Sequence, residues 1–185
     1  MRIKTDRTVI EVLSSDDAEL MLKYHIENKD HLAPWEPTRS EDYFTIENFS
    51  AMLSDNHKSY RDKTALKFAA LTPDRTEVIA VCNFTNIVFG AFQACNLGYS
   101  IARNHQGRGL MSEVLGATIA YVFDELNLHR IMANYIPNNA RSSAILDRLG
   151  FEREGLAKSY LQIAGKWQDH VLTSKINPKH QAPNK

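Results

Sequence analysis

The spacing of apolar positions along the chain changes several times, and each change predicts a new element. Residues 8–13 alternate apolar and polar and are rich in β-branched side chains, which predicts a strand. Residues 14–28 place apolar side chains at helical spacing, and Asp16 with Glu19 three positions later predicts a capping box at the helix start. The prolines within residues 31–37 end this helix, because proline disfavours helix in the residue before it.

The rest of the chain mixes strand patterns with further helices. Helical periodicity is expected over residues 42–56, 112–126 and 138–150, and Gly150 suits the C-terminal cap of the last helix. Residues 151–176 are typical of two strands joined by a hairpin near the sequence Ala-Gly-Lys. Four more strands are predicted at 66–71, 78–88, 92–102 and 130–136. This order predicts one α/β domain with a mixed sheet over residues 1–176.

Composition supports a folded domain and narrows the function classes. The chain has 185 residues, of which 43% are hydrophobic and 24% are charged, as in ordinary globular proteins. The 22 basic and 22 acidic side chains balance, so no overall field favours DNA or a membrane surface. Cys82 and Cys95 lie in apolar runs without metal-ligand spacing, which predicts buried free thiols. Without a membrane-length apolar run or a signal-peptide pattern, we expect a cytoplasmic protein, with a polar, flexible tail at 177–185.

One short loop has the composition of an anion-binding site. Residues 103–111 lie where a predicted strand turns into a predicted helix, and a helix start has unpaired N–H groups and partial positive charge. Glycines there let the backbone approach a phosphate or pyrophosphate closely. From these residues alone, a plain glycine-eased turn with solvated arginines is an equal alternative. The loop consists of Arg103, Asn104, His105, Gln106, Gly107, Arg108, Gly109, Leu110 and Met111.

The segment Gln-Gly-Arg-Gly-Leu-Met at 106–111 resembles the pyrophosphate loop, Q/R-x-x-G-x-G/A, of the GNAT N-acetyltransferase family. Met111 departs from it, because a small residue is usual there. Asn139 and the pair Gly150-Phe151 stand at the spacing that the family shows in its next helix. Longer stretches over residues 5–173 resemble the branch that acetylates ribosomal proteins. The resemblance implies the GNAT fold, a central, mostly antiparallel twisted sheet with splayed middle strands flanked by helices, and acetyl-CoA as co-substrate without a metal.

The resemblance also implies where acetyl-CoA binds. The strand over 97–102 would splay from the strand over 130–136, with the pantetheine arm between them and a backbone N–H of the first strand as oxyanion donor. The implied cofactor-binding residues are Tyr99, Ile101, Arg103, Gln106, Gly107, Arg108, Gly109, Leu110, Met111, Ser112, Asn139 and Ser142.

A general acid is needed to protonate the leaving thiolate. Many family members use a tyrosine four residues before the glycine of Gly-Phe, but that position is Leu146 here. The ribosomal branch instead resembles Asn-x-x-Ser, which Asn139 and Ser142 match. The resemblance therefore implies Ser142 as general acid. The alternative is a helix-start serine that only satisfies local backbone groups.

Several groups are candidates for the general base. Asn134 stands where some N-terminal acetyltransferases carry a glutamate, and an amide cannot act as a base. Glu36, Asp169, His170 or a chain of water molecules are the alternatives. An α-amine has a pKa near 8, so a weak or indirect base is sufficient.

In this family the first two helices overhang the acceptor. Trp35 is expected to wall the substrate slot, unless it packs inside a proline-stiffened loop, while Glu36, Glu41 and Asp42 would meet a basic peptide or its α-ammonium group.

The resemblance implies acetyl transfer, by direct attack in a ternary complex, to the N-terminal alanine α-amine of a small-subunit ribosomal protein with a basic tail. The alternatives are a small-amine acetyltransferase for a polyamine, amino acid or antibiotic, and a CoA-binding ribosome-assembly module with little turnover. Ribosome-assembly intermediates are a further expected partner, whereas direct DNA or membrane binding is not expected.

Overall fold

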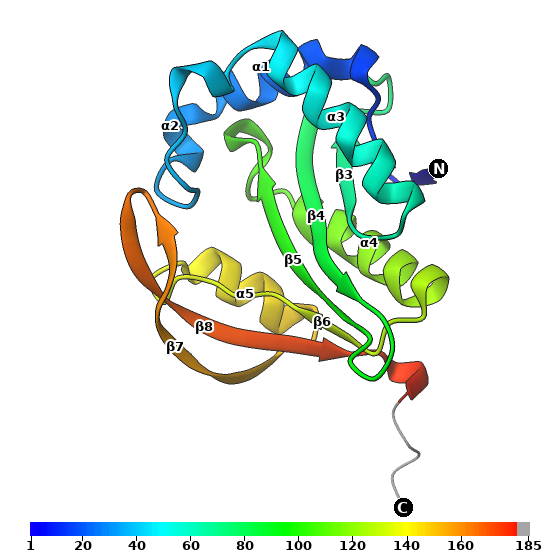
Figure 1. Ribbon diagram of the computed structural model, residues 1–185, viewed down its shortest axis with the longest axis vertical. Helices are drawn as coiled ribbons and strands as arrows, with labels where there is room; N and C mark the ends of the chain where they lie inside the picture. The colour runs from blue at the N-terminus through cyan, green and yellow to red at the C-terminus, as the bar shows by residue number, and fades with distance from the viewer. Residues whose placement is uncertain (181–185) are drawn as a thin grey trace, which may run out of the picture.

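One twisted sheet of eight strands runs through the molecule in the order β1-β2-β3-β4-β5-β6-β8-β7 (Figure 1). The computed structural model describes residues 1–180. Neighbouring strands are antiparallel except for the parallel pair β5–β6, so the predicted mixed, mostly antiparallel sheet is confirmed. The strands are β1 (Arg2–Lys4), β2 (Val9–Glu11), β3 (Leu66–Leu71), β4 (Val78–Val88), β5 (Ala94–Ile101), β6 (Arg130–Met132), β7 (Glu152–Ile163) and β8 (Lys166–Ile176).

Five α-helices and three short 3-10 turns lie between the strands of this sheet over residues 1–180, and a fourth 3-10 turn follows the last strand. None of the helices in this range is long and apolar enough to cross a membrane. The helices are α1 (Ala18–Glu27), α2 (Lys29–Leu32), α3 (Ile46–Arg61), α4 (Leu110–Leu126) and α5 (Ala140–Arg148), and the turns are η1 (Ser15–Asp17), η2 (Glu41–Tyr43), η3 (Arg103–His105) and η4 (Pro178–His180).

Helices pack against both faces of the sheet and create two hydrophobic clusters. On one face, Phe68 and Phe84 of the sheet pack with Leu115 of α4. On the other face, Leu71 packs with Tyr24 of α1 and Phe49 of α3. Burial of these large side chains is the main force that holds the three layers together. Cys82 and Cys95 are fully buried and free, as the sequence predicted.

Two local predictions were wrong. The capping box was expected from Asp16 and Glu19, but Ser14 and Asp17 form it instead. The N–H and the hydroxyl of Ser14 both donate to the Asp17 carboxylate, at 2.9 and 3.0 Å. A 3-10 turn therefore precedes α1. The strand expected over 130–136 ends at Met132, because the chain then leaves β5 and keeps only irregular contacts with β8, at Thr173 and through a bridge between Tyr135 and Val171.

The segment from Asn177 was expected to be flexible, but its described part is fastened to the domain. The Asn177 backbone N–H donates to the His129 carbonyl and its side-chain amide donates to the Leu128 carbonyl, both at 2.9 Å. Lys179 pairs with Asp124 at 2.7 Å. Residues 181–185 lie outside those described, so the domain boundary at 176 stays a prediction.

Candidate active site

The β5 and β6 strands pair over three positions and then diverge. Their register joins Ala94 to Arg130 and Asn96 to Met132, after which β5 continues to Ile101 without β6 beside it (Figure 1). We call this opening the β5–β6 splay. These are the two strands that were expected, from the sequence, to splay apart.

The β5 backbone presents alternate residues to the splay. The Ala102 N–H donates to the Ile79 carbonyl of the β4 side at 2.9 Å. Because hydrogen-bonding direction alternates along an antiparallel strand, the N–H and C=O groups of Leu97, Tyr99 and Ile101 point away from β4. The expected backbone positions at Tyr99 and Ile101 thus face the splay.

The Arg103 backbone N–H already has a partner that sequence reasoning missed. It donates to the side-chain oxygen of Asn28 at 2.8 Å, and the Asn28 amide donates to the Tyr24 carbonyl at 2.8 Å. Asn28 is buried and ends α1. This contact joins the first helix to the start of the glycine loop, and the expected role of Arg103 in cofactor binding would therefore depend on its exposed side chain or its carbonyl.

The glycine loop has the geometry that an anion requires. Gly107 and Gly109 have φ values of 74° and 76°, a backbone conformation that residues other than glycine rarely adopt. Gly109 is the N-cap of α4, so the following N–H groups have no carbonyl of the same helix to bind. Within residues 1–180, no backbone N–H from 107 to 112 donates to a protein acceptor. The residues present therefore fit a pyrophosphate.

Arg7 holds this loop from the opposite side. Its guanidinium donates to the Arg108 carbonyl at 2.7 Å and to the Glu113 carboxylate of α4 at 2.7 Å. The two contacts tie the glycine loop and the first turn of α4 to the segment before β2. No sequence pattern connects Arg7 with a loop about a hundred positions later.

A polar bridge crosses from α2 to α5 through the expected cofactor residue Gln106. The Gln106 side-chain nitrogen lies 2.9 Å from Nε2 of His31, and its oxygen accepts from Arg141 at 2.6 Å. Burial lowers the pKa of His31, which favours the neutral ring that can accept the amide proton. A second link joins α5 to α4, because Arg148 donates to the Ser112 hydroxyl at 3.2 Å.

Ser142 lies on the first turn of α5 between two partners. Its N–H donates to the Asn139 side chain at 3.1 Å, and its hydroxyl oxygen is 2.6 Å from that of Tyr99 on β5. Burial raises the pKa of Tyr99 to about 12, although the hydrogen bond between Tyr99 and Ser142 opposes this. The phenol is therefore protonated at neutral pH. Leu146, at the position of the usual tyrosine, is buried in the core.

Glu36 lies in a loop that touches the tip of the β7–β8 hairpin. Its carbonyl accepts from the Ala164 N–H at 3.0 Å, which brings the α2 end of the molecule to this hairpin (Figure 1). Burial raises the pKa of Glu36, and the positive charge of Arg39 opposes the shift. A carboxyl group in such an environment can take up a proton more readily than an exposed one.

The other expected acceptor residues lie around this loop. Trp35 is 39% exposed, so it does not pack into the core as the alternative required. Glu41 is largely exposed and pairs with Lys29 at 3.1 Å. Asp42 is also exposed. These positions allow contact with a partner, but only Glu36 combines a carboxylate with substantial burial.

The remaining base candidates have structural partners. Asp169 accepts from the Ser159 N–H at 2.8 Å, where β7 is irregular and Ser159 has a φ of 47°. His170 is buried, and its Nδ1 lies 3.1 Å from the Gln168 carbonyl. Asn134 accepts from the Thr173 N–H at 3.2 Å. Across the described chain, no three His, Cys, Asp or Glu side chains gather as a metal site.

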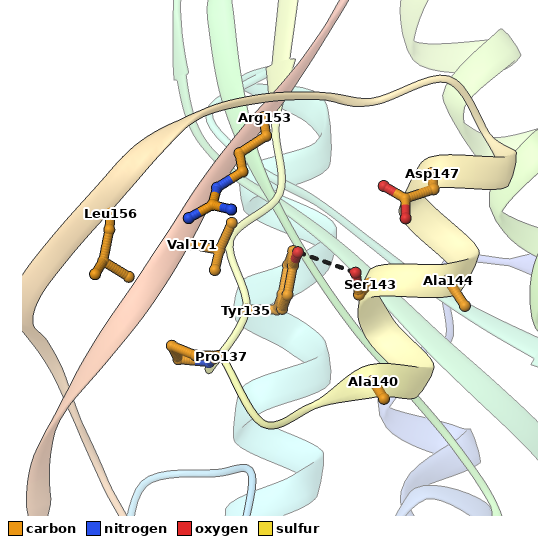
Figure 2. A pocket seen from close by; sticks show the side chains of 9 residues that line it. All are labelled: Tyr135, Pro137, Ala140, Ser143, Ala144, Asp147, Arg153, Leu156 and Val171. Carbon is orange, nitrogen blue, oxygen red and sulfur yellow. Dashed lines mark hydrogen bonds between the residues drawn. The ribbon is translucent and has the colours of Figure 1, made fainter.

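A cavity of about 480 Å³ lies against a neighbouring face of α5 (Figure 2). Tyr135 donates to the Ser143 hydroxyl there at 3.0 Å. The cavity is lined by Tyr135, Pro137, Ala140, Ser143, Ala144, Asp147, Arg153, Leu156 and Val171. None of the expected cofactor residues is among them, so this cavity is distinct from the glycine loop.

Comparison with known sequences gives a consistent result. Residues 7–152 match the acetyltransferase (GNAT) domain family. The chain is 46% identical over 178 residues to the [ribosomal protein uS5]-alanine N-acetyltransferase of Escherichia coli K12, which covers 96% of this chain and 92% of the relative.

Solved structures with the same fold include two with related names. The ribosomal-protein-S5-alanine acetyltransferase of Vibrio fischeri has a TM-score of 0.93 and 37% identity, covering 98% of this chain and 100% of that one. Mycobacterium smegmatis RimJ, solved with CoA-disulfide, has a TM-score of 0.87 and 26% identity, covering 95% of this chain and 84% of that one.

Proposed function

This chain belongs to the GNAT acetyltransferase family and uses acetyl-CoA, and from that premise we propose that it acetylates the N-terminal alanine of ribosomal protein uS5. The observation that carries the proposal is the 46% identity, over almost the whole chain, to an enzyme with that named activity. We also propose the cytoplasm, where a ribosomal protein would be met, as its location. Ribosome-assembly intermediates would be further partners.

The glycine loop and the β5–β6 splay are the proposed donor site. The free N–H groups of residues 107–112 would hold the pyrophosphate, with Arg108 and the side chain of Arg103 adding positive charge. The Tyr99 and Ile101 backbone groups would pair with the pantetheine amides along the splay. Leu110, Met111, Gln106 and Asn139 would shape the loop and the start of α5 around it.

Acetyl-CoA supplies the acetyl group as a thioester when it is bound. An N–H group of β5 that faces the splay would stabilise negative charge on the thioester oxygen. Glu36 would accept the proton of the attacking α-amine, directly or through water, because its raised pKa makes it a better base than an exposed carboxylate. Ser142 would give a proton to the leaving sulfur. Asp169 is the second candidate base, but its carboxylate already caps the Ser159 N–H.

The acceptor would enter between the α2 loop and the β7–β8 hairpin. Trp35 would wall the slot, and Glu36 would meet the α-ammonium group before it loses its proton. A basic tail beyond the alanine would find the exposed carboxylates of Glu41 and Asp42. Charge complementarity of this kind acts mainly on encounter and orientation.

The acceptor assignment is tested with matched peptides from the N-terminus of uS5. We expect a peptide with a free N-terminal alanine to gain one acetyl group on its α-amine. The same peptide with a blocked N-terminus should gain none, even at internal lysines. Mass spectrometry with fragmentation reads the position of the acetyl group. Equal acetylation of both peptides would overturn the assignment and favour a lysine or small-amine acetyltransferase.

Replacing Glu36 with glutamine should weaken use of the peptide more than binding of acetyl-CoA. For the native enzyme, log kcat/KM for the peptide should fall with slope one below the amine pKa of about 8. It should steepen to slope two below the pKa of Glu36, because the protonated carboxyl cannot accept a proton. This second fall should begin at a higher pH than for an ordinary glutamate, since burial raises this pKa.

The pH dependence distinguishes Glu36 from a general loss of stability. In the Glu36→Gln variant, slope one should persist to low pH. Glu47→Gln, which changes an exposed carboxylate at the start of α3, should keep the native profile. A second fall that survives in Glu36→Gln would assign the base to another group.

A further inference from the structure

A serine by itself is a poor acid for a thiolate. The pKa of an alcohol is comparable with that of water, near 15.7, whereas a thiol has a pKa of about 8.5. Transfer of the Ser142 proton alone would exchange a stable thiolate for an unstable alkoxide. A serine can act in this role when a second acid replaces its proton at the same time.

Tyr99 is placed to be that second acid. The two hydroxyl oxygens are 2.6 Å apart, at the short end of the O–H···O range. The contact joins β5 to α5, which are 43 positions apart at these residues. Asn139 holds the Ser142 backbone N–H at 3.1 Å, so the first turn of α5 and its hydroxyl are fixed relative to the strand.

We propose that Tyr99 is a proton relay behind Ser142, an inference that rests on the proposed role of Ser142 as general acid. As the carbon–sulfur bond breaks, Ser142 gives its proton to sulfur and takes the phenolic proton of Tyr99. The negative charge ends on the phenolate, and water returns a proton to it before the next turnover. Ser142 touches the leaving group and Tyr99 acts through it.

The burial pattern of the two elements fits this assignment. Leu146 stands where many family members have a phenol on the helix. It is buried, and its aliphatic side chain has no proton to donate. The phenol is supplied instead by Tyr99 of β5, the strand whose backbone faces the proposed acetyl-CoA site. Burial raises the pKa of Tyr99 to about 12 and keeps the phenol protonated at working pH. This pKa lies above that of a thiol but well below that of an alcohol, so the relay lowers the cost of protonating the sulfur.

A second tyrosine, Tyr135, hydrogen-bonds to the same helix and provides a matched control. Tyr135 donates to Ser143, the residue after Ser142, at 3.0 Å. Tyr135→Phe and Tyr99→Phe therefore each remove one hydroxyl-to-hydroxyl bond to α5 and should lower stability by a similar amount. Only Tyr99→Phe should affect the chemistry. We expect kcat to fall about 10- to 100-fold in Tyr99→Phe, with KM for acetyl-CoA nearly unchanged, and to stay within about twofold in Tyr135→Phe.

The double variant and the solvent isotope effect complete the test. Tyr99→Phe should cause no further loss in a Ser142→Ala background, because the relay acts only through Ser142. Single-turnover rates in mixtures of H₂O and D₂O should indicate two protons in flight for the native enzyme and one for Tyr99→Phe. Native kcat in Tyr99→Phe, with a large loss in Ser142→Ala, would overturn the relay but leave the proposed function intact. Native kcat in both variants would instead remove Ser142 as the acid, and the relay with it.

Discussion

Gly109→Pro is expected to abolish binding of acetyl-CoA. Gly109 has a φ of 76°, and proline is fixed near −65°, so the loop cannot keep its shape. Proline also removes one of the N–H groups proposed to hold the pyrophosphate. Isothermal titration with acetyl-CoA measures the loss, and circular dichroism with thermal unfolding confirms that the variant is folded.

Two alanine variants separate loop function from backbone strain. Gly90, between β4 and β5, has a φ of 77°, and an added Cβ would meet no atom within 4 Å. At Gly109 an added Cβ would lie 3.7 Å from Nη2 of Arg7, which is an ordinary contact. Alanine at Gly90 and at Gly109 should therefore lower the unfolding free energy by a similar amount, about 1 kcal/mol. Only Gly109→Ala should weaken acetyl-CoA binding, and Arg108→Ala should have a smaller effect than Gly109→Pro. Native affinity in a folded Gly109→Pro protein would refute the loop assignment.

Ser142→Ala is expected to lower kcat by about 10- to 10⁴-fold with little change in acetyl-CoA affinity. The reason is that the substitution removes a proton donor needed when the carbon–sulfur bond breaks, while the N–H that Asn139 accepts from is kept. Stopped-flow measurement of thiol release under single-turnover conditions isolates this step from product release.

Ser143→Ala is the control for this experiment. Ser143 lies next along α5 and bonds to Tyr135 rather than Tyr99, so its loss should leave thiol release near the native rate. Equal rates for the native enzyme and Ser142→Ala would mean that water or another group supplies the proton.

The elements predicted most accurately are strands that are recognisable from a run of buried apolar residues. Residues 66–71 and 78–88 form β3 and β4 at the predicted boundaries, because most of β3 and the first half of β4 are apolar and buried in the centre of the sheet. β1 has only three residues, too few for a pattern to be read. β6 is shorter than predicted, since residues 133–136 leave β5 at the splay and bond only irregularly to β8.

The candidate site was predictable only where its residues are close in sequence. The Gly107 and Gly109 conformations follow from a local motif, and Asn139 with Ser142 follows from helix capping. The contacts of Arg7 with Glu113 and of Asn28 with Arg103 join residues 106 and 75 positions apart. Such contacts depend on how the elements pack, which no local spacing encodes.

The position of β8 in the sheet has a consequence for biosynthesis. β8 is the final strand along the described chain, yet it lies between β6 and β7, with Ile176 paired to Arg130. β7 therefore has no sheet to join until residues 166–176 have left the ribosome, and these distant pairings form late. A nascent chain paused before that point would expose β7 and one edge of β6, and unpaired strand edges of this kind promote aggregation.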